Sequence, residues 1–173
     1  YVPNFFIGPS HGLHPMETFV LIDELFTTSF IDKNAYPNLL NCYRNLPDKA
    51  WVSQIGRMVA RNESNYRVFI QDMPMGSIPD FLKAIGYTGK LHLNFLSWLE
   101  VANKWGQKVD LDLDVSKEIS PKIGVEIYCQ SMGEAELMLT EFYNQGLCSK
   151  LNFEKLKSHF SSIFCGEDVE RHH

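Results

Sequence analysis

Residues 66–89 of this 173-residue chain match residues 123–146 at a constant shift of 57 positions. Six of the 24 aligned residues are identical, where average amino-acid usage would give about one or two. The identities include Met75-Gly76 with Met132-Gly133, and Gly89 with Gly146. Two amphipathic units could share such patterning without a common origin, but the coincident glycines favour an internal repeat.

Hydrophobic spacing predicts the order strand, strand, helix, helix in each repeat. The first copy has strand-like patterns at 51–61 and 66–73, a short helix at 78–85 and a longer one containing Phe95, Trp98, Ala102 and Trp105. The second copy has strands at 109–115 and 122–129, joined by a loop that ends in Pro121. Helices around 135–142 and 153–163 follow, the longer one again with apolar residues spaced by three, four and three.

This order predicts an α+β fold in which an antiparallel sheet carries helices on one face. We expect an N-terminal region at 1–50, with helices from Pro15 to about Phe30 and near Leu39–Leu46, then ββαα units at 51–106 and 107–164. Residues 165–173 form a tail, and its final His172-His173 is expected to be a remnant of a purification tag.

Strand alternation sorts the side chains onto two faces of the predicted sheet. The helix-covered face receives Val68, Ile70, Val109, Leu111, Leu113, Val115, Val125 and Ile127. The other face, called the charged face below, is predicted to be uncovered and receives Arg67, Phe69, Gln71, Asp110, Asp112, Asp114, Gly124, Glu126 and Tyr128. If the first strand keeps the repeat register, Trp51, Ile55, Arg57 and Val59 lie on the charged face as well.

The charged face is where we expect a ligand to bind. Aspartate is a poor strand former, so three of them at alternate positions of one strand need a reason. A solvated acidic surface, a cation or ligand site that includes Glu126, and pairing with Arg57, Arg67 or Lys122 are the alternatives. The predicted site comprises Arg57, Arg67, Phe69, Gln71, Asp112, Asp114, Glu126 and Tyr128.

Arg57 and Arg67 are predicted to be cross-strand neighbours at the centre of that site. Two such cations need an anion between them, which could come from Asp112, Asp114 or Glu126 or from a phosphate, diphosphate or carboxylate ligand. The apolar residues around them also predict self-association through this face or a sheet edge, unless the N-terminal helix covers it.

Composition excludes several classes of protein. Sixteen Lys and Arg against twenty-one Asp and Glu give a net charge of −5, so a nucleic-acid partner is not expected. No apolar run is long enough for a membrane span, and no signal peptide is visible, which favours a cytoplasmic location. The four cysteines are widely spaced and form no Cys-x-x-Cys pair, so we expect reduced thiols. No cofactor motif occurs, and we expect no metal site.

Two strings carry a resemblance to a known family: Arg67-Val68-Phe69-Ile70-Gln71-Asp72-Met73-Pro74 before a helix, and Gly124-Val125-Glu126-Ile127-Tyr128. Together with the element order over about residues 35–164, they resemble the ABBA-type aromatic prenyltransferases, whose αββα repeats close a barrel around the substrate. That family needs about five repeats to close its barrel, and this chain has two.

Two functions therefore stand as expectations. In the first, the chain is a non-catalytic accessory module that binds a small molecule, a peptide or a partner, including a second copy of itself, on the uncovered sheet face. In the second, which the resemblance implies, it is a prenyl-transfer or related biosynthetic enzyme whose barrel is completed by another segment or chain. The first is preferred, because two units cannot enclose the dry cavity that catalysis requires. Whether the chain is an enzyme stays open at this point.

Overall fold

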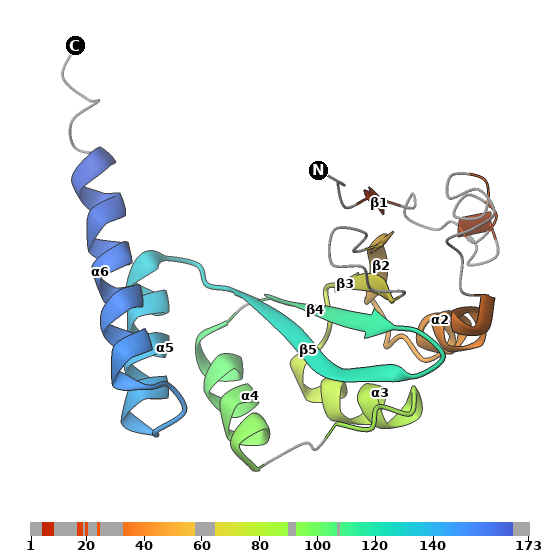
Figure 1. The fold of residues 1–173 in the computed structure, drawn as a ribbon. Coiled ribbons are helices and arrows are strands. Elements are labelled where there is room, and N and C mark those ends of the chain that lie inside the picture. Colours follow the sequence, from red (N-terminus) through yellow and green to blue (C-terminus); the bar gives the residue numbers. More distant parts are fainter. Residues whose placement is uncertain are drawn as a thin grey trace. The chain divides into compact units, whose positions relative to one another are not determined.

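A computed structural model describes residues 5–8, 17–18, 20, 24, 33–57, 65–89, 93–106 and 108–167. The predicted N-terminal helix from Pro15 to Phe30 falls mostly outside these residues, as does Val59. The elements follow one another as β1 (Phe5–Ile7), α2 (Tyr36–Arg44), β2 (Trp51–Arg57), β3 (Tyr66–Gln71), α3 (Ile78–Ala84), α4 (Leu93–Trp105), β4 (Lys108–Val115), β5 (Ile119–Tyr128), α5 (Met132–Asn144) and α6 (Lys150–Glu167) (Figure 1). The predicted order of strand, strand, helix, helix therefore occurs twice between β2 and α6.

The chain forms two compact units, one of residues 1–90 with 108–126 and one of residues 91–107 with 127–173. The first contains the hairpins of both predicted repeats together with α2 and α3, and the second contains α4, α5 and α6. Superposition of 51–106 on 107–164 stays a prediction.

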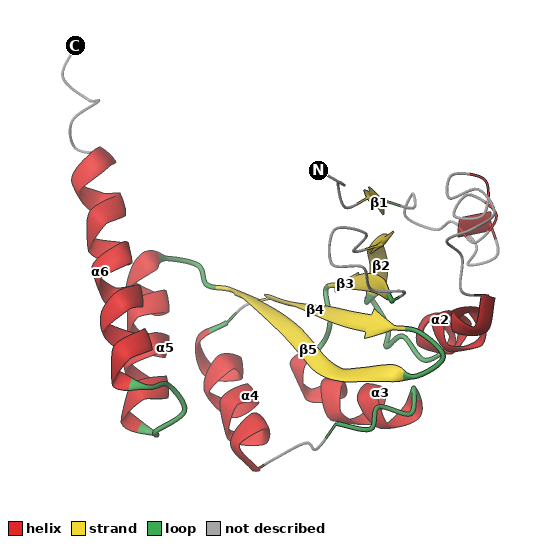
Figure 2. Ribbon diagram, in the orientation of Figure 1, coloured by secondary structure: helices red, strands yellow, loops and turns green. Residues whose placement is uncertain are grey.

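The first unit is built on one five-stranded sheet in the order β1-β2-β3-β4-β5, and the fold is α+β (Figure 2). β1 pairs with β2, β2 with β3 and β3 with β4, each time antiparallel. The predicted loop up to Pro121 is wrong, because Pro121 is the third residue of β5. Proline fits there because β5 is the last strand in the sheet order, where a missing N–H costs no ladder bond.

The core of the first unit lies on the face predicted to be covered. Val68 and Ile70 of β3 are fully buried and stand opposite Leu113 and Leu111 of β4, which are also fully buried. Ile78, Phe81 and Leu82 of α3 are buried as well, and Figure 1 shows α3 beneath the sheet. Directly opposed residues of antiparallel strands share a face, so these apolar side chains form one layer.

One side chain deep in the first unit gives a direct test of burial. Cys42 of α2 is fully buried, and desolvation raises its pKa to about 12 from about 9, since burial disfavours the thiolate. At pH 8 we expect iodoacetamide to modify the half-buried Cys148 in the native protein and to leave Cys42 unmodified until denaturant is added. Peptide mass spectrometry of the labelled protein would show this, and equal labelling of the two thiols would contradict it.

The same pKa shift gives an expected pH dependence. Below pH 9 both folded and unfolded chains keep the Cys42 thiol protonated, so its contribution to stability is complete. Between about pH 9 and 12 the unfolded chain loses that proton first, so the Cys42 contribution to the free energy of unfolding falls. A Cys42→Ala variant should lack this part of the alkaline loss.

Candidate functional site

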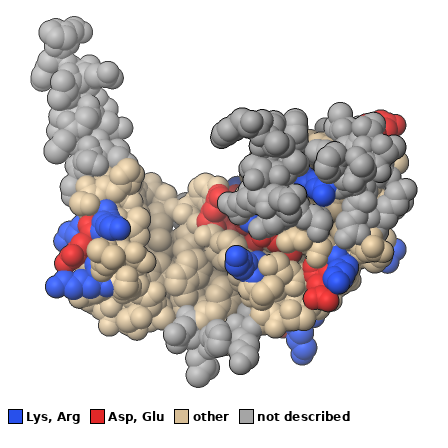
Figure 3. All heavy atoms as spheres, in the orientation of Figure 1, with Lys and Arg blue, Asp and Glu red and all other residues tan. Residues whose placement is uncertain are grey.

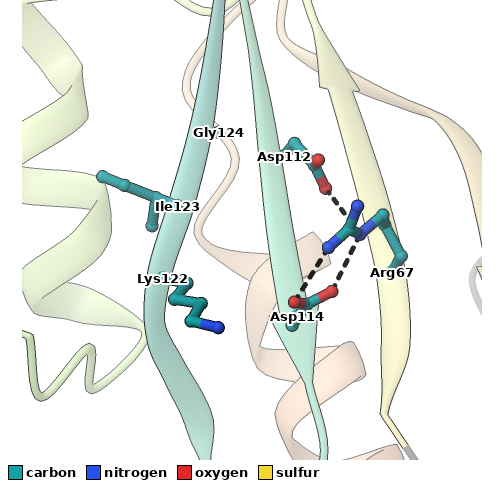
Figure 4. Close-up of a pocket in the computed structure, with 6 residues that line it drawn as sticks. All are labelled: Arg67, Asp112, Asp114, Lys122, Ile123 and Gly124. Carbon is teal, nitrogen blue, oxygen red and sulfur yellow. Dashed lines mark hydrogen bonds and ion pairs between the residues drawn. The ribbon is translucent and has the colours of Figure 1, made fainter. Parts of the chain in front are cut away.

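The charged face is organised by the pairing of β3 with β4. Arg67 stands opposite Asp114, and Phe69 stands opposite Asp112. The Arg67 guanidinium donates from Nε to Asp114 Oδ1 at 2.9 Å and from Nη2 to Asp114 Oδ2 at 3.0 Å, which is a bidentate pair. Its Nε also lies 3.4 Å from Asp112 Oδ1. Figure 4 shows the guanidinium between the two carboxylates.

A second ion cluster begins at the same strand pair and explains Asp110. This aspartate is only 4% exposed, and its Oδ1 accepts the backbone N–H of Asp72 at 3.1 Å. Lys108 Nζ lies 3.5 Å from Asp110 Oδ1 and 3.3 Å from Asp72 Oδ1. Although burial lowers the pKa of Lys108, its hydrogen bonds and charge interactions with Asp72 and Asp110 together outweigh that effect and raise it.

The aspartate row is therefore explained by pairing within the chain. Each of the three carboxylates has a basic side chain within 3.5 Å, Arg67 for two of them and Lys108 for the third. Asp110 and Asp114 are buried, so the solvated acidic surface is the wrong alternative for them. In the space-filling view, acidic and basic atoms lie next to one another (Figure 3).

A pocket of about 180 Å³ opens beside this ion pair. Six residues line it, from three neighbouring strands: Arg67, Asp112, Asp114, Lys122, Ile123 and Gly124. Lys122 extends from β5 at the Asp114 end of the pocket, whereas Ile123 points away from the carboxylates (Figure 4). Among the described residues, no grouping of three or more His, Cys, Asp or Glu side chains could hold a metal ion.

Gly124 sets the shape of this pocket. A Cβ atom at this position would lie 3.0 Å from Asp112 Cβ and 3.2 Å from Asp112 Oδ2. Gly124 therefore stands directly across from Asp112, and its missing side chain leaves the room that the Asp112 carboxylate occupies. In the predicted repeat the corresponding position is Arg67, so the two copies differ at the point that forms the pocket.

The predicted placement of Arg57 is wrong. Arg57 pairs with Tyr66, and Ile55 pairs with Val68, so both belong to the core face, opposite to Arg67. The cause is a β-bulge between Val52 and Gln54, which inserts one residue and reverses the alternation after it. Trp51 precedes the bulge and pairs with Gln71, so its predicted place on the charged face is confirmed. The site built on two adjacent arginines is lost with this register.

The other predicted residues have separate outcomes. Phe69 lies on the charged face but contacts Phe6 of β1, with ring centroids 5.7 Å apart, and does not line the pocket. Gln71 lies beside Trp51 at the end of β3. Glu126 and Tyr128 are exposed residues of β5 outside the pocket lining, and Tyr128 belongs to the second unit. The internal acidic partner predicted for Arg67 is confirmed as Asp114 together with Asp112.

The predicted site left out three of the six pocket residues, Lys122, Ile123 and Gly124, and both residues that hold Asp110. Lys122 and Gly124 shape the pocket, and Asp72 and Lys108 hold Asp110. The role of Lys108 could have been predicted, because it lies two residues before Asp110 and so shares a strand face with the three aspartates. Nothing in the sequence indicated that Asp72 would contact Asp110. The backbone of Asp72 has a positive φ of 55°, and its N–H donates to the Asp110 carboxylate.

Comparisons with protein families, curated proteins and solved structures find no match to this chain. None of the helices in the described part of the chain has the length and the apolar composition that a bilayer crossing requires.

The pocket suits a ligand that carries both signs of charge. Both oxygens of Asp114 accept from Arg67, so these donors and acceptors already satisfy one another. Asp112 makes a longer contact of 3.4 Å with Arg67 through Oδ1, and its Oδ2 lies beside Gly124 in the pocket lining. Asp112 can therefore accept from a cationic or N–H group of a ligand, and Lys122 can donate to an anionic or carbonyl oxygen.

Proposed function

We propose that this chain is a non-catalytic binding module that holds a small polar molecule or a peptide segment at the Arg67–Asp112–Asp114–Lys122 pocket. The ligand would place an ammonium or amide N–H group against Asp112 and a carboxylate or carbonyl oxygen against Lys122. A free amino acid and a short peptide share this chemistry. The observation that carries the proposal is the pocket itself, which combines both signs of charge on three neighbouring strands of the sheet.

The ion pair supports this function because it fixes the pocket before any ligand arrives. The bidentate contact holds Arg67 and Asp114 in one geometry, and Arg67 in turn lies against Asp112. A charged group held in position by its neighbours loses little conformational entropy on binding. Binding is favoured over catalysis because both oxygens of Asp114 already accept from Arg67, so this carboxylate holds the ion pair and is not directed at a reacting group. The prenyl-transfer alternative gains no support, because the donors of Arg67 that would meet a diphosphate are directed at Asp114.

Isothermal titration with free amino acids and dipeptides is the test of this proposal. Some members of the panel should bind, and their N-acetylated forms should bind more weakly because the ammonium group is lost. Asp112→Asn keeps the shape of the pocket and removes its charge, so we expect the dissociation constant to rise about 10- to 100-fold. A panel in which nothing binds would contradict the proposal.

Two glycine variants separate the pocket from general effects on the sheet. Gly124→Ala pushes a Cβ against Asp112 and should weaken binding, because the carboxylate must move by a few tenths of an ångström. Gly76→Ala is the matched control, since a Cβ there would meet no heavy atom within 4 Å. Equal binding by the two variants would show that the ligand binds elsewhere.

A further inference from the structure

β5 lies at the edge of the sheet and presents a long strand for pairing. Its ten residues, Ile119–Tyr128, come last in the strand order. An edge strand carries a row of backbone N–H and C=O groups on its outer side, and these groups can pair with another strand. Which residues of β5 send these groups outward can be derived from the pairing of β4.

The backbone groups of β4 alternate between its two neighbours. The Val109 carbonyl accepts the N–H of Met73 at 2.9 Å, so Val109 faces β3, and Asp112, three residues on, faces β5. Gly124 stands directly across from Asp112 and so faces β4 in return. The backbone groups of Ile123 and Val125, one residue to either side, therefore point outward.

Pro121 agrees with this assignment. Pro121 lies two residues before Ile123, so its backbone groups point to the same, outer side of β5. Its missing N–H therefore costs no hydrogen bond within the sheet. Its carbonyl oxygen accepts from the Tyr87 hydroxyl at 2.7 Å. The outer edge of β5 is thus occupied near its start and offers backbone groups around Gly124.

The charges of β5 are arranged symmetrically about Gly124. Lys122 lies two residues before it and Glu126 two residues after it, both exposed. If a second β5 pairs antiparallel with a two-fold axis at Gly124, Lys122 of each copy faces Glu126 of the other. These are positions between the hydrogen-bonded pairs, where opposed side chains are closest. Sliding the register by four residues in either direction would place Lys122 or Glu126 against itself.

We infer that a second copy of this chain pairs with β5 in this register and makes one continuous antiparallel sheet. Ile123 exchanges backbone hydrogen bonds with Val125 of the second copy, and the two glycines meet at the axis without side chains. The contact is isologous, so it closes after two copies. It also brings Glu126 of the second copy next to Lys122 at the rim of the pocket, although the dimer does not depend on ligand binding there.

Charge reversal is the test, with the association measured by sedimentation velocity between about 1 and 100 µM, where mass action can populate a dimer. The wild-type chain should dimerise in this range. Lys122→Glu and Glu126→Lys should each raise the dimer dissociation constant at least about 10-fold, because each opposes like charges twice. The double variant Lys122→Glu/Glu126→Lys should restore it. Lys117→Glu is the matched control, since Lys117 is an exposed lysine in the β4–β5 turn.

Mixing the two single variants sharpens the test, because the all-acidic and all-basic strands should form a heterodimer. Hydrogen exchange of the wild-type chain gives an independent readout, in which the amides of Ile123 and Val125 gain protection as concentration rises. A strictly monomeric wild-type chain would overturn the inference. A dimer that Lys122→Glu leaves unchanged, or a double variant that stays monomeric, would overturn it as well.

Discussion

Replacing Arg67 by Met is expected to lower the free energy of unfolding by about 3 kcal/mol, because it leaves carboxylates in a low-polarity position without their cation. Asp114 is 7% exposed and takes two hydrogen bonds from Arg67, and Asp112 lies 3.4 Å from the same guanidinium. Methionine keeps the length and apolar stem of the side chain, so the change isolates the charge. Urea unfolding followed by circular dichroism measures it.

The control for this variant is Arg44→Met, which removes an exposed arginine from the last turn of α2 and should change stability by less than about 0.5 kcal/mol. A further variant tests the mechanism. Adding Asp114→Leu to Arg67→Met removes both charges of the pair, including the buried carboxylate, and should recover part of the loss. An Arg67→Met protein as stable as the wild type would mean that the ion pair contributes nothing.

The alternation of β3 and β4 could be predicted from sequence because these strands pair without interruption. Val68, Ile70, Leu111 and Leu113 alternate with Arg67 and the aspartates at the period of a strand, and each of these residues lies on the predicted face. The same regularity made Asp112 and Asp114 foreseeable partners of Arg67. Where two strands pair without a bulge, the alternation of side chains in the sequence predicts which residues lie on the core face and which lie on the charged face.

The position of Arg57 could not be predicted because a bulge is a property of the pair of strands. Ser53 is the extra residue, and nothing in Trp51-Val52-Ser53-Gln54-Ile55 marks it as such. One inserted residue moves every later side chain to the other face. The alternation starting from Trp51 therefore placed Ile55 and Arg57 with Arg67, although the structure pairs them with Val68 and Tyr66.

The pocket could not be predicted because its decisive residue has no side chain. Gly124 was assigned correctly to the charged face, but it matters through the space it leaves beside Asp112. That space depends on which residue of β4 stands opposite, and a difference of one residue in the hairpin would put another side chain there. A sequence shows that a glycine is present in a strand and does not show what approaches it.

The second unit offers an equally large expected effect at Phe142. Its ring in α5 stacks on Trp98 of α4, with centroids 5.3 Å apart and planes 11° apart, and it is 7% exposed. Hydrophobic spacing predicted both of the helices that carry these residues. Phe142→Ala should lower the free energy of unfolding of this unit by about 3–5 kcal/mol, since it removes the stacking and leaves a cavity. Loss of helical circular dichroism at lower denaturant concentration would show this.

Thr140→Ala, at an exposed position of the same helix, is the control and should have almost no effect on the free energy of unfolding. Equal stability of the two variants would place Phe142 outside the core of the second unit.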